Sequence, residues 1–219
     1  MMFQECLITR ALLELCGTAL LAYTVGFAVS SQLSTISAAL SMGVCVSTLI
    51  HIIGRYSGAH LNPAVTLVLG VHSSGLRDVL SKKFLLQTGS YILAQVIGSM
   101  VGFAVFLSSS STDLPASRID GSGEELVLTV VLLLLILTWA KEGRLCPFAQ
   151  PLTGIVIGTG IAFLSILGGS TSCGILNPAI AISLMMYTDM QGLSSIFASE
   201  CMSVLLVCCF IFVSRRWSN

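Results

Sequence analysis

Two copies of one tripeptide carry the most specific chemistry in the sequence: Asn62-Pro63-Ala64 and Asn177-Pro178-Ala179. Each copy opens a short apolar run, at 62–70 and 177–187, whereas a helix needs about 20 residues to cross a bilayer. Pro is favoured in the first turn of a helix, because its missing N–H would have no intrahelical partner there, and Asn is a good N-cap. The pattern predicts two half-helices that begin at the tripeptides.

The amino end of a half-helix offers hydrogen-bond donors and a positive partial charge. Its first four N–H groups lack intrahelical partners, and its aligned peptide dipoles leave about half a positive charge. Two such ends that meet at mid-membrane would resist cations, including hydronium. We expect Asn62 and Asn177 to cap their own half-helices and to donate to a water molecule, which is then poorly placed to relay a proton. Ala64 and Ala179 would let the two tips approach each other.

The bulk composition predicts a membrane protein. Of the 219 residues, 55% are hydrophobic and only 9% are charged, and the mean hydropathy is +0.95. A soluble domain carries about a quarter charged residues, so lipid must cover much of this surface. A net charge of +0 gives no electrostatic argument for a nucleic-acid partner. We predict six membrane spans, at 11–30, 35–53, 84–107, 125–140, 151–168 and 193–213.

The positively charged residues predict the orientation of these spans, since Lys and Arg favour cytoplasmic loops. If the amino terminus is cytoplasmic, Arg118 lies outside. The other nine then lie inside: Arg10, Arg55, Arg77, Lys82, Lys83, Lys141, Arg144, Arg215 and Arg216. An even number of spans places both termini in the cytoplasm. The amino-terminal residues lack the pattern of a cleaved signal peptide.

The chain also repeats a Glu-x-x-x-Thr pattern, which opens one span in each half. Glu14 precedes Asn62 by 48 residues and Glu125 precedes Asn177 by 52 residues, so the two halves are nearly in register. Each half contributes three spans, an odd number, and the second half is therefore inverted relative to the first. This arrangement brings the two half-helices tip to tip.

We therefore predict an all-α membrane protein with one domain over 1–219. Repeat one covers about 1–107 and repeat two about 124–219. Six transmembrane helices and two re-entrant half-helices form an inverted repeat. Irregular backbone at this depth is tolerated only where it lines a wet cavity or is buried in protein, so a pore is expected between the tripeptides.

Three carboxylates lie inside predicted spans, where charges are costly and usually functional or paired. We interpret Glu14 and Glu125 as structural supports that accept N–H groups of the re-entrant loops. The alternative, a pair that carries protons or ions, lacks partner cations at membrane depth. Glu200 has no explanation from the sequence: a packing role, a pH-sensitive group and a lumen-facing carboxylate all stay open.

The remaining motifs do not indicate a metal site, a cofactor or an enzyme. No C-x-x-C pair occurs, and most cysteines lie in apolar runs, where Cys behaves as a small hydrophobe. No Ser-His-Asp, metal-ligand or phosphate-loop pattern is found. Two small-xxx-small pairs predict close helix packing inside the subunit: Gly98 with Gly102, and Gly154 with Gly158.

At these residues the sequence resembles the major intrinsic proteins, the aquaporin and aquaglyceroporin family. The matching stretches are 14–18, 57–66, 91–95 and 173–179, and the resemblance as a whole extends over essentially the whole chain. The resemblance implies a right-handed helix bundle, a pore in each subunit and a homotetramer. It also implies that Gln95 and His60 support the first tripeptide together with Glu14. His60 is expected to be hydrogen-bonded in place rather than to act as a pH gate, since no carboxylate lies next to it in sequence.

The departures from the family pattern concern the outer constriction. Family water channels usually carry Arg three residues after the second Asn, where this chain has Ile180. Counting without gaps places Met42, Ser165 and Gly174 at the other constriction positions, with the Gly174 carbonyl as a candidate acceptor. These residues predict an uncharged, less polar and wider constriction. The stretch 168–184 resembles that of the unorthodox superaquaporin subfamily, which also carries an aliphatic residue at this position, whereas the intact first Asn-Pro-Ala looks orthodox. Cys173, four residues before Asn177, is a candidate site for block by mercurials.

These observations predict a passive channel for water, with glycerol, hydrogen peroxide and ammonia as further solutes. Its partners would be these uncharged molecules, the lipid bilayer and other copies of the chain. Two alternatives stay open: a coupled transporter, since inverted repeats with broken helices also occur there, and a non-conducting scaffold closed by Met42 and Ile180. The sequence identifies neither the physiological solute nor the membrane.

Overall fold

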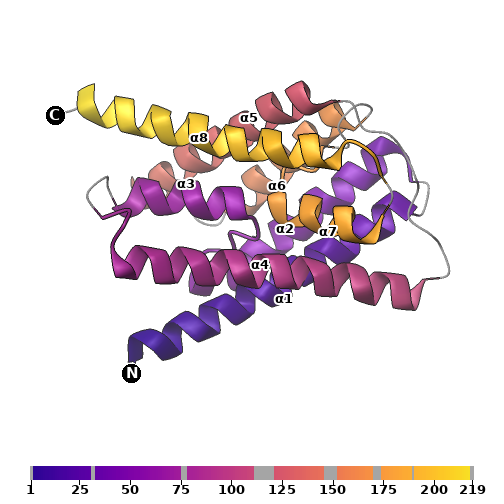
Figure 1. Cartoon of the computed structure of the whole chain (residues 1–219), viewed down its shortest axis with the longest axis horizontal. Helices are drawn as coiled ribbons and strands as arrows, with labels where there is room; N and C mark the ends of the chain where they lie inside the picture. Colours follow the sequence, from indigo (N-terminus) through magenta and orange to yellow (C-terminus); the bar gives the residue numbers. More distant parts are fainter. Residues whose placement is uncertain are drawn as a thin grey trace.

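The computed structural model describes residues 2–30, 33–74, 78–110, 121–145, 152–169, 174–188 and 190–217 (Figure 1). These residues form eight α-helices and fit the predicted all-α class. The bounds are α1 Met2–Ser30, α2 Thr35–Ser57, α3 Pro63–Ser74, α4 Lys82–Ser109, α5 Ser122–Leu145, α6 Thr153–Gly168, α7 Pro178–Tyr187 and α8 Leu193–Trp217. The two tripeptides begin α3 and α7, the short helices predicted from the sequence.

Five of the described helices, α1, α2, α4, α5 and α8, are long and apolar enough to cross a membrane. The fifth predicted span, 151–168, corresponds to α6, which has 16 residues. At 1.5 Å per residue α6 is about 24 Å long, somewhat less than the hydrocarbon thickness of about 30 Å. Both ends of the described chain lie at the same end of the bundle, the left side of Figure 1.

The distribution of side chains is that of a protein solvated by lipid. Large apolar side chains on the outer faces are exposed, for example Val44 at 64%, Leu93 at 62% and Phe210 at 60%. Charged and amide side chains such as Glu14 and Gln95 are fully buried. A water-soluble protein shows the reverse pattern, so the apolar exterior supports a multi-pass membrane protein.

Glycines set the closest helix contacts in the bundle. A Cβ added to Gly98 or Gly102 on α4 would meet the backbone carbonyls of Leu15 and Ala19 on α1. Gly158 on α6 packs in the same way against the carbonyl of Gly43 on α2. The small-xxx-small pairs therefore do pack inside the subunit, and the prediction of internal contacts is confirmed.

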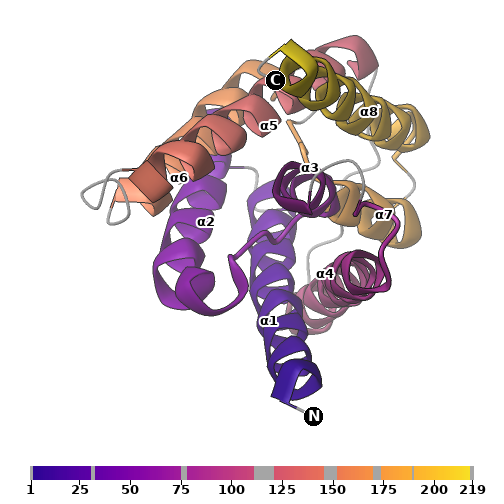
Figure 2. The ribbon, with the colours of Figure 1, turned by 90° about the vertical axis from the view of Figure 1, so that its left-hand side faces the viewer.

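Viewed from one end, the long helices surround α3, with α1 and α4 on one side and α5 and α8 on the other (Figure 2). The half-helices approach each other from opposite ends of the bundle (Figure 1). Helix α2 ends at Ser57 and is capped by Gly58, whose φ of +98° reverses the chain and starts the first re-entrant loop, 58–62. The second re-entrant loop is described from 174 to 177. These two loops carry the candidate site.

Candidate functional site

Each re-entrant loop has left-handed backbone at the residues three positions and one position before its Asn. In the first loop these are Ala59 and Leu61, with φ of 48° and 54°. In the second they are Gly174 and Leu176, with φ of 55° and 53°. A left-handed conformation costs about 1–3 kcal/mol for a residue with a side chain and persists only where its surroundings enforce it. The two loops therefore share one backbone path, which is strained at Ala59, Leu61 and Leu176 and is accommodated by a glycine at 174.

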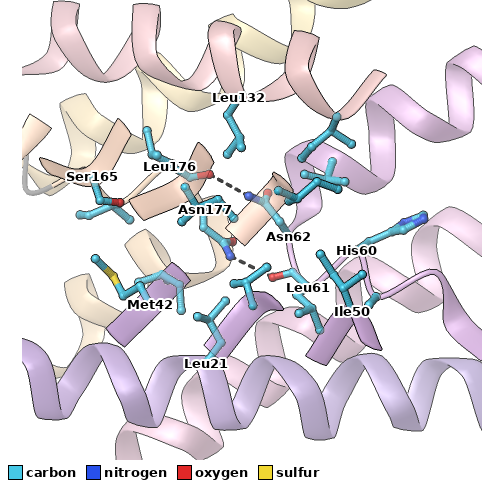
Figure 3. Close-up of a pocket in the computed structure, with 18 of the residues that line it drawn as sticks. Leu21, Met42, Ile50, His60, Leu61, Asn62, Leu132, Ser165, Leu176 and Asn177 are labelled. Atoms are coloured by element: carbon cyan, nitrogen blue, oxygen red, sulfur yellow. Dashed lines mark hydrogen bonds between the residues drawn. The ribbon is translucent and has the colours of Figure 1, made fainter. Parts of the chain in front are cut away.

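The two tripeptide asparagines hold the loops together by reciprocal hydrogen bonds (Figure 3). Asn62 Nδ2 donates to the carbonyl of Leu176 at 2.7 Å, and Asn177 Nδ2 donates to the carbonyl of Leu61 at 2.9 Å. Each Asn Oδ1 also accepts the N–H two residues on, at 2.8 Å in the first half-helix and 3.1 Å in the second. Since an amide nitrogen carries two N–H groups, each Asn keeps one further donor for a ligand.

A cavity of about 160 Å³ lies along this junction, with room for several water molecules. Its polar side chains are few: His60, Asn62, Thr153, Ser165 and Asn177. Most of the wall is aliphatic and comes from α1, α2, α5 and α6: Leu21, Val25, Val46, Ile50, Leu132, Ile136, Ile157 and Ile161. The asparagine amides are thus the main donors midway along an otherwise apolar passage (Figure 3).

The four predicted constriction residues all line this cavity. Met42, Ser165 and Ile180 also line a second cavity of about 170 Å³ next to it, so they lie where the two spaces join. Ser165 Oγ donates to the carbonyl of Gly174 at 3.0 Å. This bond engages one lone pair of the carbonyl that the sequence offered as an acceptor. Neither Met42 nor Ile180 has a side-chain donor, and Ile180 is almost fully buried.

One buried carboxylate holds the first loop. Glu14 on α1 accepts the N–H of His60 at 3.0 Å and that of Leu61 at 2.7 Å. It also accepts a bond of 2.9 Å from Gln95 Nε2 on α4. Gln95 Nε2 lies 2.9 Å from Thr66 Oγ1 as well, and so links the carboxylate to the half-helix itself. The structure brings the predicted supports Glu14, Gln95 and His60 together.

His60 itself is held on several sides. Its Nδ1 lies 3.2 Å from Thr66 Oγ1, and its ring meets the Tyr91 ring edge-on with centroids 5.3 Å apart. Tyr91 in turn donates to the carbonyl of Ser57 at 2.7 Å, just before the loop. The ring is therefore hydrogen-bonded in place, as expected, at the edge of the cavity.

Two buried carboxylates hold the second loop. Glu125 on α5 accepts the N–H of Leu176 at 2.5 Å, and Glu200 on α8 accepts the N–H of Asn177 at 2.6 Å. Both side chains are fully buried. Glu125 has the role predicted from the sequence, since it accepts an N–H group of the re-entrant loop. Glu200 was left without an explanation, and the structure makes it a loop acceptor rather than a group that lines the cavity.

A family model described as major intrinsic protein matches residues 2–199 of the chain. The chain belongs to the major intrinsic protein family. Aquaporin-1 of Sus scrofa is 34% identical over 66% of this major intrinsic protein, and Aquaporin-1 of Homo sapiens is 33% identical over 72%. Aquaporin-2 of Bos taurus is 30% identical over 68%. The matches cover 54%, 59% and 56% of these relatives, so the chain spans little more than half of their length.

The fold of this major intrinsic protein is also that of a solved structure, the X-ray structure of the aquaglyceroporin from Plasmodium falciparum. The TM-score is 0.68 at 23% identity, and the match covers 93% of this chain and 95% of the other. The likeness shows the fold, with its inverted repeat and half-helices.

Several predicted features lie outside the described residues, Cys173 and Arg118 among them. The described cysteines are free thiols. The described part of the chain contains no group of three or more His, Cys, Asp or Glu side chains placed to hold a metal ion.

Sequence reasoning missed the role of Glu200 and the bond from Ser165 to Gly174. One signal was available for Glu200. It lies on the third long helix of its repeat, as Gln95 does in the first repeat, and Gln95 was already among the supports.

Proposed function

We propose that this major intrinsic protein is a passive channel for water and small uncharged solutes. The pore is the cavity between the two re-entrant loops. The observation that carries the proposal is the reciprocal pair of bonds between Asn62 and Asn177, which fixes two helix amino ends against one passage. The names of the relatives, aquaporin and aquaglyceroporin, support the same class of cargo.

Rejection of ions follows from two features of this passage. The aliphatic wall offers no groups to replace the hydration shell of an ion, and stripping that shell without replacement is very costly. The amino ends of α3 and α7 add positive partial charge at the middle of the passage, and this charge disfavours cations. A water molecule that accepts from both asparagines is oriented away from a proton relay.

The constriction favours solutes beyond water. Met42 and Ile180 present apolar surface, and Ser165 supplies a single hydroxyl that already donates to the Gly174 carbonyl. An Arg at position 180 would bring a charge and five donors; Ile brings none. Glycerol, hydrogen peroxide and ammonia are therefore proposed as cargo alongside water.

The assembly and orientation are part of the proposal. Each chain forms one domain of two repeats with its own pore, and four chains form a homotetramer. Both termini face the cytoplasm, which the Lys and Arg distribution supports and which agrees with two chain ends at one end of the bundle (Figure 1).

The test separates a channel from a coupled transporter. Purified protein in vesicles is given gradients of glycerol, urea, hydrogen peroxide or water, each with and without a sodium or proton gradient, and flux is followed by stopped-flow light scattering. A channel gives flux proportional to the solute gradient and indifferent to the ions. Flux that saturates at low concentration, or that is driven uphill by sodium or protons, would refute the proposal.

A further inference from the structure

The two carboxylates at the second loop form a pair with no counterpart at the first. Glu125 and Glu200 accept consecutive N–H groups, those of Leu176 and Asn177, so their head groups come together at one point of the bundle. They are close enough to interact with each other. Glu200 Oε2 is buried and has no hydrogen-bond partner in the described part of the chain.

The first loop shows which kind of side chain the carboxylate of a loop needs as its partner. There the third long helix of the repeat supplies Gln95, whose amide donates to Glu14 and contacts Thr66. In the second repeat the third long helix supplies Glu200, and the residue four after Asn177 is Ala181 rather than a hydroxyl residue. Glu200 therefore occupies the place at which the first repeat has a hydrogen-bond donor, the Gln95 amide. An ionised Glu200 carries no hydrogen and could not act as a donor there.

Two ionised carboxylates side by side in an apolar interior repel each other strongly, and burial adds the cost of desolvating both. The N–H groups of the second loop offset part of this repulsion, but no cationic side chain among the described residues acts on Glu200. The other described titratable group that interacts with Glu200 is the Cys201 thiol, on the same helix. The half-helices that pack against α8 carry titratable side chains only in their last turns, His72 and Tyr187.

The other described charged side chains on α8 and α5 are either far along the helix or exposed at the surface. The described cation on α8, Arg215, is 15 residues from Glu200, about 22 Å along the helix. Its guanidinium donates to the carbonyl of His72. On α5, Glu124 precedes Glu125 but is exposed at the surface.

We propose that Glu125 and Glu200 together bind one proton. Glu200 Oε2 carries it and donates to the Glu125 carboxylate, while the Oε1 atoms of both groups keep their loop N–H donors. The proton is taken up from solution when the chain folds. With this proton, the acid–carboxylate pair holds the Asn177 half-helix in the way that the Glu14–Gln95 pair holds the Asn62 half-helix.

Infrared spectroscopy of the full-length protein tests this proton directly. At neutral pH the wild type is expected to show a buried protonated-carboxyl stretching band that shifts in D₂O. The substitution Glu200→Gln removes the band, because the remaining Glu125 then accepts from an amide and is ionised. Glu124→Gln, next in sequence to Glu125 but exposed, leaves the band intact and is the matched control.

Thermal unfolding supplies a second readout with a defined sign. The native state holds a proton that the unfolded chain releases at neutral pH, so wild-type stability should fall as pH rises. Glu200→Gln should keep the neutral-pH melting temperature within a few degrees and remove this fall. Glu200→Ala should lower the melting temperature by about 5–10 °C, since it leaves a buried N–H unpaired and a cavity.

The proposal is overturned if the wild type shows no protonated-carboxyl band, or if Glu200→Gln leaves the band in place. It is also overturned if Glu200→Gln destabilises the protein as much as Glu200→Ala. A melting temperature that rises with sodium chloride in the wild type but not in Glu200→Gln would assign the pair to a metal cation instead. None of these measurements depends on solute flux, so they stand apart from the channel assay.

Discussion

The two re-entrant loops follow one backbone path but are held by different chemistry. Ala59 and Leu61 in the first loop, and Gly174 and Leu176 in the second, have the same left-handed conformation. The first loop relies on Glu14 for two N–H groups, with Gln95 as the neutral partner of that carboxylate. The second divides its N–H groups between Glu125 and Glu200. The path is dictated by the half-helix tips, whereas the supports differ between the two halves.

The largest difference is expected when each loop loses its main carboxylate. Glu14→Ala strips acceptors from His60, Leu61 and Gln95, and an unpaired buried donor costs about 1–3 kcal/mol. We expect about 3–6 kcal/mol of destabilisation. Glu125→Ala should cost less, because Glu200 still holds the neighbouring N–H. Thermal unfolding of detergent-solubilised protein compares the two, with Glu124→Ala as the control, and equal losses would show that the supports are equivalent.

The loops also differ in the space available to a side chain at the left-handed residue three positions before the Asn, which is Ala59 in the first loop and Gly174 in the second. A Cβ on Gly174 would lie 2.6 Å from Ser165 Cα, which is backbone and cannot move aside. Gly174→Ala should therefore cost about 2–4 kcal/mol, from this overlap and from the positive φ. Ala59 already carries a Cβ at the equivalent position, so Ala59→Gly should change stability by less than about 1 kcal/mol. Gly123→Ala, where nothing lies within 4 Å, is the control for an added methyl.

Substitution of either tripeptide asparagine should affect ion leak in the same way in both loops. Asn62→Asp and Asn177→Asp each lose one cross-loop donor and bring a negative charge to the positive centre of the passage. We expect cation leak to rise about tenfold, equivalent to about 1.4 kcal/mol, in both variants. Fluorescent sodium and pH indicators inside vesicles measure the leak. An increase in only one of the two would show that a single half-helix provides the barrier.

The smallest expected effect concerns the constriction rather than the loops. Ile180→Arg introduces a charge and five donors where Met42 and Ser165 line the passage. The ratio of glycerol to water flux should fall about fivefold, a difference of about 1 kcal/mol. Stopped-flow light scattering gives both rates from one vesicle preparation. A ratio that stays at the wild-type value would place selectivity elsewhere in the passage.

Much of this arrangement was predictable because it depends on local patterns. The tripeptides place α3 and α7, since Asn and Pro have fixed preferences at helix starts. The apolar runs place the long helices, although α1 begins at Met2 rather than near residue 11. Hydropathy reports the part of a helix that lipid covers, whereas backbone hydrogen bonds continue through the polar residues before it.

The parts that could not be predicted depend on contacts between distant segments. Glu200 becomes a loop acceptor because α8 packs beside the second loop, 23 residues earlier in the chain. The bond from Ser165 to the Gly174 carbonyl arises because that loop folds back against α6. For Glu200 the sequence offered only its repeat-equivalent helix, the one that carries Gln95 in the first half, and for the Ser165–Gly174 bond it offered no signal. The outer constriction could be located only by counting from a family pattern.

Osmotic water permeability of a plugged variant tests the central claim most directly. Met42 lies on the wall of both cavities, and Val44, two residues on, is 64% exposed on the outer face of the same helix. If water crosses between the two re-entrant loops, wild-type vesicles should swell and shrink far faster than empty vesicles. Met42→Trp should reduce that rate to the empty-vesicle level, while Val44→Trp should leave it unchanged. Wild-type rates equal to those of empty vesicles, or a Met42→Trp variant as fast as Val44→Trp, would contradict the account.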